Sequence, residues 1–333
     1  MNPADLPRTV VRAVRCAVED GELAAGVVVP ERVVVERTRP GGVGEYATPV
    51  AFQVAKGAGC APREVADVLA RRLGREPGIE RVAVTGAGFL NFVLPPPSAP
   101  LVIQEAIVQD IVIRDVRGGA AVVTDANADT DATVEIGLGL RERVVRETVL
   151  RLLSSQGGSE QDVPDALPVA PLAKRDADVV ERYGADAARW GMLAVPARET
   201  PAFCDVLLLQ GEGSEFFRVR YAHARSRALL RNAGQLGFGP VVGDVDDAPE
   251  LLRVLAGHPL VLEAAAHHRA PERLTRHLVE LADALLDFQY RVLPKGDEKP
   301  SAAHRARLAL AEAAGTVLAG GLALLGIDAP TRL

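Results

Sequence analysis

The sequence predicts an α+β protein with a small N-terminal α+β domain, a middle segment of weaker pattern and a C-terminal all-α helical bundle. Three observations support this division. Residues 1–97 mix helical periodicity with short β-branched and aromatic runs, residues 98–175 show less regular patterning, and residues 176–333 form one amphipathic helical pattern after another. The run Pro95–Pro100 contains four prolines and predicts a linker at the first boundary.

The first domain is predicted from apolar spacing and from residues that interrupt it. Apolar residues recur at near-helical intervals from Leu6 to Val18, and Pro62 stands where a first-turn proline is tolerated. Gly86-Ala87-Gly88 separates two short apolar runs and predicts a turn between two strands. The expected helices cover residues 4–20, 49–56 and 62–73, and the expected strands cover residues 33–35, 82–84 and 89–94.

The remaining segments are predicted to be mainly helical. In the middle segment we expect a helix near 101–109, apolar runs at 111–113 and 120–124, an amphipathic helix over 134–153 and a loop over 154–171. Gly326 is placed to end the last helix in a left-handed conformation. The C-terminal helices are expected at about 179–193, 214–235, 247–256, 271–292 and 302–325.

Charge is distributed unevenly along the chain. The net charge is −6, but residues 98–211 hold 18 acidic and 11 basic side chains, whereas residues 212–333 hold 15 of each. The first 97 residues hold 12 basic and 11 acidic side chains. Because attraction to phosphate depends on local basic contacts, both end domains are compatible with RNA binding, while the middle segment would repel a phosphate backbone.

Cysteine usage and hydropathy indicate the compartment. Cys16, Cys60 and Cys204 have neither metal-ligand spacing nor an even count for disulfides, which favours a reducing, cytoplasmic setting. No charged-then-apolar leader opens the chain, and we expect no segment that spans or binds a membrane.

The first domain resembles the additional N-terminal domain of arginyl-tRNA synthetases, which holds the tRNA elbow. The matching residues are Gly44-Glu45-Tyr46-Ala47 and Gly86-Ala87-Gly88-Phe89-Leu90-Asn91-Phe92. The resemblance makes Tyr46, Phe89 and Asn91 candidate tRNA contacts, with Phe89 stacking on a base and Asn91 reading a base edge. The alternative for Phe89 is a core residue next to a purely structural turn.

The last third resembles the anticodon-binding domain of the same family, named after an Asp-Ala-Leu-Arg-like signature. Its matching stretches are Gly184–Trp190, Phe217–Arg225 and the C-terminal Ala323–Leu333, which departs from the family by not finishing in Met. The resemblance makes Tyr221 a candidate stacking residue and Arg225 a candidate phosphate or base contact. We interpret His223 as a structural histidine within a packed helix.

The middle segment resembles a collapsed catalytic domain. The run from Asp125 to Arg141 parallels the family stretch that contains the H-I-G-H-type signature, with Glu135 and Leu138 at the places of its two histidines. The sequence holds 6 histidines, the first of which is His223, so neither signature histidine is present. Leu172-Ala173-Lys174-Arg175 is a short match to the second catalytic loop, and the alternative is that residues 111–175 form an unrelated linker domain. We therefore expect no catalytic residues and no binding of ATP or arginine.

Other site chemistry is weakly represented. His267, His268 and His277 lack a carboxylate or cysteine that would complete a metal site, so we expect no metal. The acidic run ending in Asp247 is interpreted as a solvated turn.

These observations predict a non-catalytic tRNA-binding protein with tRNA for arginine as the first candidate partner. One alternative is a protein-interaction module that partners a true synthetase or an enzyme that uses aminoacyl-tRNA. A third hypothesis is residual arginine-tRNA ligase activity. A basic stripe around Tyr221, Arg225, Arg227 and Arg231 would favour RNA, whereas an apolar patch there would favour a protein partner.

Overall fold

The computed structural model describes all residues except 2, 25, 39–40, 127–138, 165 and 177. The chain divides into two compact units, one built from residues 1–97 and 259–264 and the other from the described residues of 98–258 and 265–333. The described residues between 98 and 175 therefore pack in the same unit as the C-terminal helices.

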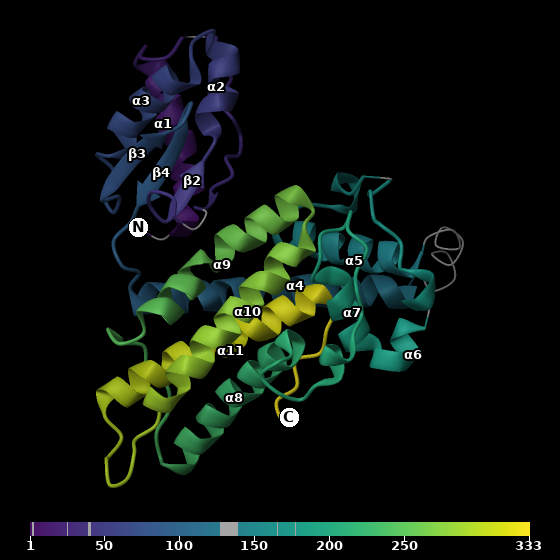
Figure 1. Ribbon diagram of the computed structural model, residues 1–333. Coiled ribbons are helices and arrows are strands. Elements are labelled where there is room, and N and C mark those ends of the chain that lie inside the picture. Colours follow the sequence, from purple (N-terminus) through teal and green to yellow (C-terminus); the bar gives the residue numbers. More distant parts are fainter. Residues whose placement is uncertain (2, 25, 39–40, 127–138, 165, 177) are drawn as a thin grey trace. The chain divides into compact units, whose positions relative to one another are not determined.

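The first unit is a four-stranded antiparallel sheet with three α-helices (Figure 1). The strand order is β1-β2-β4-β3, and α2 and α3 pack on the sheet while α1 packs on α3. The core comprises aliphatic side chains from all three helices together with Leu90 and Phe92 of the central strand β4. The elements are α1 (Leu6–Glu19), β1 (Glu36–Arg37), β2 (Tyr46–Thr48), α2 (Val50–Ala58), α3 (Pro62–Leu73), β3 (Arg81–Thr85) and β4 (Phe89–Val93), after a short 3₁₀ turn, η1 (Pro3–Asp5).

The predicted strand at residues 33–35 is wrong, and the strand β2 was not predicted. Val33 and Val35 are buried and alternate with Val34, as they would in a strand. The carbonyl oxygen of Val34, however, accepts a hydrogen bond from the Thr48 hydroxyl at 2.9 Å, and the backbone ladder begins only at Glu36. The apolar run thus fixes which side chains are buried without fixing where strand pairing starts.

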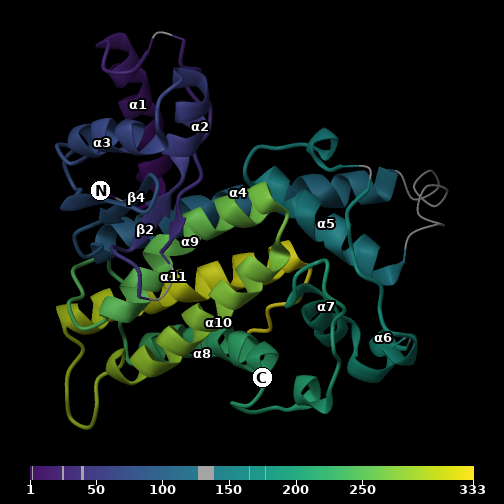
Figure 2. The ribbon, with the colours of Figure 1, turned by 45° about the horizontal axis from the view of Figure 1, so that its top comes forward.

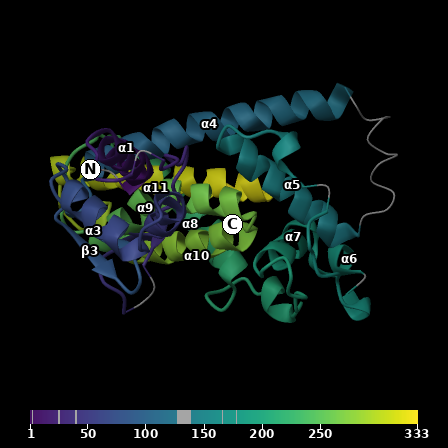
Figure 3. The same ribbon diagram turned by 90° about the horizontal axis from the view of Figure 1, so that it is seen from above.

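The second unit is helical, and its central element is α11 (Ala302–Leu325). This helix packs against α8, α4 and α10, and Figure 3 shows α4 running alongside it. Ser301 caps its first turn, and Gly326 ends it at φ 72°, as predicted. The other helices are α4 (Ala99–Ala126), α5 (Leu140–Ser155), α6 (Val179–Tyr183), α7 (Ala185–Leu193), α8 (Glu215–Gln235), α9 (Pro249–His268) and α10 (Pro271–Phe288), with 3₁₀ turns η4 (Glu160–Asp162), η5 (Lys174–Asp176), η6 (Asp205–Leu208) and η7 (Gln289–Arg291).

Three predicted helix boundaries change for local reasons. The expected helix over 179–193 is two helices, because Gly184 adopts φ 80° and ψ 160°, outside the helical region. The helix that we expected to stop at residue 256 continues through Pro259 to His268, since buried residues such as Leu262 and Ala265 keep it packed. The apolar runs after residue 109 continue a single helix, α4.

Among the described helices, α11 alone has the length and hydropathy of a membrane span. Length and composition alone do not make this helix a membrane span, because the buried core helix of a protein can have the same length and hydropathy. The helix α11 is apolar because it lies at the centre of the bundle, where 78% of its most apolar window is buried inside the protein.

Candidate nucleic-acid interface

The turn between β3 and β4 presents an aromatic ring at the surface of the first unit. Phe89 is 45% exposed, and its ring lies against that of Phe52 with centroids 5.0 Å apart. Gly88 adopts φ 141°, and a Cβ there would lie 2.9 Å from the carbonyl oxygen of Pro62. Arg63 donates a hydrogen bond to the carbonyl of Gly86 at 3.0 Å. The turn is thus fixed to the start of α3, and Phe89 keeps one exposed side on which a base could stack.

Asn91 lies two residues further along β4, inside the sheet. It is 4% exposed, and its amide nitrogen donates to the Thr85 hydroxyl at 2.7 Å. These contacts give Asn91 a clear part in holding the β3–β4 hairpin that carries Phe89. Its predicted contact with a base edge stays a prediction.

Tyr46 lies in the core of the first unit. It is 5% exposed and pairs with Phe92 in the antiparallel register of β2 and β4, and burial raises the pKa of its hydroxyl to about 12. The preceding residues explain the short motif: Gly44 adopts φ 73° where a Cβ would lie only 2.5 Å from the Phe92 carbonyl oxygen, and the Glu45 carboxylate accepts a hydrogen bond from the Leu94 amide at 3.1 Å. The Gly44–Ala47 motif therefore docks β2 onto the central strand.

In the second unit, α8 places Tyr221 and Arg225 one helical turn apart. Tyr221 is 38% exposed, and its ring stacks on Phe217 with centroids 5.6 Å apart and an interplanar angle of 11°. The guanidinium of Arg225 donates to the Gln289 side-chain oxygen at 2.5 Å. Because Gln289 is uncharged, this contact orients Arg225 and leaves its positive charge uncompensated.

Two further residues join this surface that the sequence analysis did not single out. Gln289 and Tyr290 belong to η7, directly after α10, and Tyr290 is 66% exposed. Phe217, Tyr221, Arg225, Gln289 and Tyr290 are named here the aromatic–arginine surface. The residues of η7 lie inside the helix predicted over 271–292, whereas α10 ends at Phe288, so the part played by Gln289 is seen only in its contact with Arg225.

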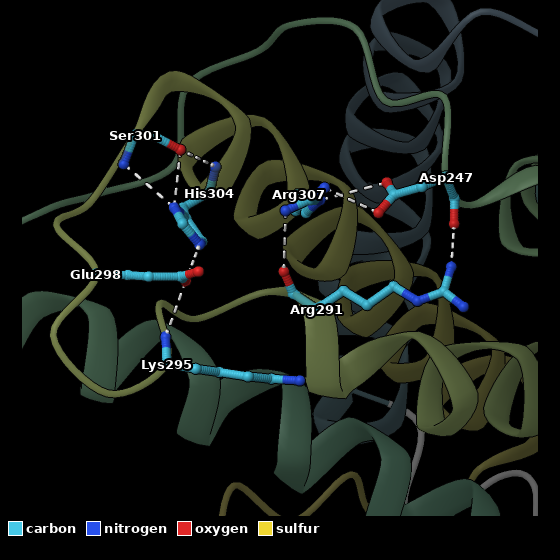
Figure 4. A network of polar contacts seen from close by, with 7 residues as sticks. All are labelled: Asp247, Arg291, Lys295, Glu298, Ser301, His304 and Arg307. Atoms are coloured by element: carbon cyan, nitrogen blue, oxygen red, sulfur yellow. Dashed lines mark hydrogen bonds and ion pairs between the residues drawn. The ribbon is translucent and has the colours of Figure 1, made fainter.

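A polar network fixes the segment that follows η7 (Figure 4). Arg307 pairs with the Asp247 carboxylate at 2.9 Å and donates to the Arg291 carbonyl at 3.4 Å, while Arg291 donates to the Asp247 carbonyl. In the same view, Glu298 lies 3.7 Å from His304 and accepts from the Lys295 amide. Asp247 is therefore a structural anchor, which corrects its interpretation as part of a solvated turn.

His223 faces the C-terminal residues. It is 4% exposed, and its Nδ1 lies 2.9 Å from the Pro330 carbonyl oxygen. Burial lowers the pKa of the ring, so the neutral form with a proton on Nδ1 fits this contact. Arg231 donates to the Thr331 carbonyl at 3.3 Å, and Figure 2 shows the C-terminal residues close to α8. The structural interpretation of His223 agrees with this position.

The arginines of α8 differ in how far they are neutralised. Arg218 pairs with Asp283 at 2.9 Å, and Arg220 lies 3.9 Å from Asp186. Arg225, Arg227 and Arg231 form no ion pair within the part of the chain that the structure describes. Of these three, Arg225 lies on the same side of α8 as the exposed ring of Tyr221, whereas Arg227 and Arg231 lie on other sides of the helix, so the basic residues do not form one stripe beside Tyr221.

The middle segment is organised around a buried arginine that sequence reasoning treated only as the end of a motif. Arg141 is 1% exposed, and its guanidinium donates to five backbone carbonyls at distances from 2.5 to 3.3 Å. Desolvation lowers its pKa. The acceptors are the carbonyls of Ala170, Met192, Pro196, Ala197 and Glu199. Arg141 thus ties α5 to the loop after α7, whereas Glu135 and Leu138 lie outside the described residues.

The three histidines considered as metal ligands, His267, His268 and His277, do not form one cluster. His277 stacks on the buried His258 with centroids 5.1 Å apart, while His267 and His268 contact each other edge-on at the exposed end of α9. Among the residues that the structure describes, no group of three or more histidine, cysteine or acidic side chains could hold a metal ion.

Comparisons with known proteins match both units. A family model described as the arginyl tRNA synthetase N terminal domain matches residues 9–94, and one described as the DALR anticodon binding domain matches residues 219–333. The arginyl-tRNA synthetase of Thermus thermophilus is similar in fold, with a TM-score of 0.55 at 15% identity over 98% of this chain and 100% of that chain. A putative arginyl-tRNA synthetase from Campylobacter jejuni gives a TM-score of 0.41 at 23% identity, over 47% of this chain and 35% of that chain.

The fold and the two matched domains thus define a protein of the tRNA synthetase type with an anticodon-binding helical domain. More specifically, the chain belongs to the arginyl-tRNA synthetase family through its N-terminal and DALR domains. Residues 95–218 lie outside both matched ranges, and the match to the Campylobacter jejuni protein spans about a third of that chain.

Proposed function

We propose that this protein binds tRNA without activating an amino acid, and that tRNA for arginine is its first candidate ligand. The observation that carries the proposal is the aromatic–arginine surface, in which an exposed tyrosine lies beside an oriented arginine whose charge is uncompensated. Stacking rings and unpaired arginines are the groups that recognise single-stranded RNA loops. The exposed ring of Phe89 supplies a second stacking position in the other unit.

The non-catalytic part of the proposal rests on chemistry that the sequence lacks. The earliest histidine is His223, inside the DALR domain, so no histidine precedes it to stabilise ATP phosphates during adenylation. We therefore propose that neither ATP nor arginine is bound. A cytoplasmic location is proposed on the same basis, since tRNA is the ligand and the three cysteines are free thiols.

Filter binding with unmodified tRNA for arginine, a non-cognate tRNA and two salt concentrations tests the function. Preference for the arginine tRNA together with salt-sensitive binding is the expected result. Equal, weak binding of both tRNAs would reject it. Arginine-dependent pyrophosphate exchange by the purified chain would instead reveal ligase activity and overturn the non-catalytic proposal.

Single substitutions locate the contacts. Arg225→Ala should weaken binding of the arginine tRNA by ~1–3 kcal/mol, because it removes the oriented guanidinium. We expect a loss of similar order for Asn91→Ala. Thr85→Val is the matched control, because it removes the hydrogen-bond partner of the Asn91 amide and leaves Asn91 itself in place. Equal losses in both would assign Asn91 to positioning Phe89, and unchanged affinity in Arg225→Ala would remove the aromatic–arginine surface from the RNA interface.

A second candidate function is a protein-interaction module, favoured by one specific observation. The helix α4 buries Val102, Ile103, Ala106 and Ile113 and also exposes several apolar side chains. Exposed apolar residues clustered on a helix are characteristic of protein contacts. The exposed side chains are Leu101, Ile107, Val108, Ile111 and Val112. A protein partner that binds the chain only while Ile107 and Ile111 are unchanged would support this function.

A further inference from the structure

The second unit contains a cavity of about 570 Å³ on a different side of α8 from the aromatic–arginine surface. Arg220, His223 and Arg227 line it, at the three- and four-residue spacing that places side chains on one side of a helix. Tyr221 and Arg225 lie about 100–160° around the helix from these three residues, since each residue advances the helix by about 100°. The cavity is completed by residues of α4 and α11 and by residues 327–331 of the C-terminus.

The arginines at this cavity have hydrogen-bonding capacity left over. Arg227 is exposed and makes no hydrogen bond or ion pair with any described residue. The Nε of Arg220 is buried without a hydrogen-bond partner, and its guanidinium lies over the Phe216 ring at 5.1 Å. Arg114 differs, because its guanidinium is paired with Asp110 at 2.6 Å. Arg227 is thus the cation without a carboxylate partner at this cavity, and Arg220, which lies 3.9 Å from Asp186, is a weakly paired second one.

The other lining groups restrict the chemistry of that ligand. His223 contributes no charge, because burial lowers its pKa and its Nδ1 is engaged by Pro330. The floor from α11 includes the small side chains of Ala319 and Ala323, which leave room for a group the size of a sugar. Among the described residues that line the cavity, His223 is the one with an aromatic ring, so stacking of a base is not favoured.

Carboxylate and hydroxyl groups complete the set. Asp328 lines the cavity and can accept hydrogen bonds from hydroxyl groups, and Thr316 and Thr331 can donate or accept them. A ligand with only negative charge would be repelled by Asp328, whereas a ligand that joins an anionic group to hydroxyl groups would satisfy both kinds of residue. Guanidinium groups match phosphate in geometry as well as in charge.

We propose that this cavity binds a ribose phosphate group, with Arg220 and Arg227 on the phosphate and Asp328 on the sugar hydroxyls. The group can come from the backbone of a bound RNA or from a free phosphorylated sugar or nucleotide. The RNA source rests on the proposed tRNA-binding function, while the free ligand does not.

Two pairs of variants test the proposal in the full-length chain. Arg227→Gln removes one available cation from an exposed side chain, and Arg276→Gln removes the same charge from an exposed position on α10 that does not line the cavity. Ala319→Glu introduces a carboxylate into the cavity, and Ala319→Gln introduces a neutral side chain of similar size. Thermal melting establishes whether each variant is folded. If Ala319→Glu does not fold, Arg227→Gln still tests the proposal, because Arg227 is exposed and its substitution leaves the core unchanged.

The probes are ribose 5-phosphate and ribose by calorimetry, and tRNA by filter binding. If the ligand is free, ribose 5-phosphate binds and ribose does not, Arg227→Gln weakens binding roughly tenfold, and Ala319→Glu abolishes it. If the ligand is RNA backbone, Arg227→Gln and Ala319→Glu weaken tRNA binding and lower the salt slope by about one, whereas Arg276→Gln and Ala319→Gln do neither.

The proposal is overturned if ribose 5-phosphate does not bind the wild-type chain and tRNA binding is the same in Arg227→Gln and Arg276→Gln. Failure of the proposed function is recognised separately, because a wild-type chain that binds no tRNA in the filter-binding titration rejects that function whether or not ribose 5-phosphate binds. Binding of ribose 5-phosphate that survives both Arg227→Gln and Ala319→Glu would place its site elsewhere and would also reject the cavity.

Discussion

At His258 the protein buries an imidazole ring of which neither nitrogen has a hydrogen-bond partner among the described residues. Desolvation lowers the pKa of this ring from 6.5 to about 4. Between these two pH values the unfolded chain binds a proton that the folded protein does not. The free energy of unfolding therefore falls as the pH is lowered from 6.5 towards 4, by at most about 3 kcal/mol.

Chemical denaturation at a series of pH values checks this expectation. His258→Phe keeps an aromatic ring against His277 and cannot titrate, so its free energy of unfolding should vary less over the same range. His268→Phe, at an exposed position, is the control and should follow the wild-type curve. Parallel curves for wild type and His258→Phe would show that another group causes the acid sensitivity.

Arg141 illustrates a different use of a buried charge. A guanidinium surrounded by five carbonyl oxygens satisfies groups that would otherwise be buried without partners. Arg141→Met removes all five hydrogen bonds while keeping a long apolar side chain, and we expect the free energy of unfolding to fall by about 3 kcal/mol or more. Urea denaturation measures the loss. Arg143→Met on the same helix makes none of these contacts and should cost less than about 1 kcal/mol.

At the scale of elements, η7 is the part that links the fold to the proposed RNA surface. Gln289 accepts a hydrogen bond from Arg225 and donates one to the Leu286 carbonyl at 2.8 Å, so it connects α8 to the end of α10. Gln289→Glu should keep this geometry and neutralise Arg225. We expect it to weaken tRNA binding and to lower the salt slope by about one without lowering the melting temperature.

The comparison variant for this element is Gln289→Ala, which releases Arg225 and preserves its charge. Its salt slope should remain that of the wild type, although its affinity falls because the guanidinium is no longer oriented. If both variants change the slope equally, the charge of Arg225 is not the quantity that Gln289 controls.

The elements also show what sequence reasoning could reach. The helices α3 and α11 were predicted at their observed bounds, because a proline or a serine stands at the start of each helical segment and a glycine stands directly after its end. The strand β2 was missed, because three residues that follow glycine and glutamate carry no periodicity of their own. The strand exists through contacts distant in sequence, such as the pairing of Thr48 with Leu90.

The candidate site was predicted less completely for a similar reason. Exposure could not be derived from the motifs: Tyr46 and Asn91 are buried, whereas Phe89 and Tyr221 are partly exposed. The contacts of Arg225 with Gln289 and of Arg141 with the loop after α7 join segments more than 50 residues apart. Such pairs leave no local signal in a single sequence.

At the scale of the whole molecule, the two matched domains raise the question of whether they hold one tRNA together. Two linked binding sites on a single ligand multiply their contributions, because the second contact forms at the high effective concentration set by the first. The segment that connects the matched domains here, residues 95–218, decides whether both can engage the same tRNA.

A double-mutant cycle with Phe89→Ala and Arg225→Ala measures this coupling of units. If both domains bind one tRNA, each single variant lowers the affinity and the double variant lowers it by about the product of the two factors, since distant and independent contacts are additive in free energy. If only the DALR domain binds, Phe89→Ala leaves the affinity for arginine tRNA unchanged and the double variant equals Arg225→Ala. Phe52→Leu, which removes the ring that supports Phe89, should reproduce a weaker form of the Phe89→Ala effect in the first case and have no effect in the second. The cycle therefore separates a protein that grips tRNA at two points from one that retains a single anticodon-binding surface.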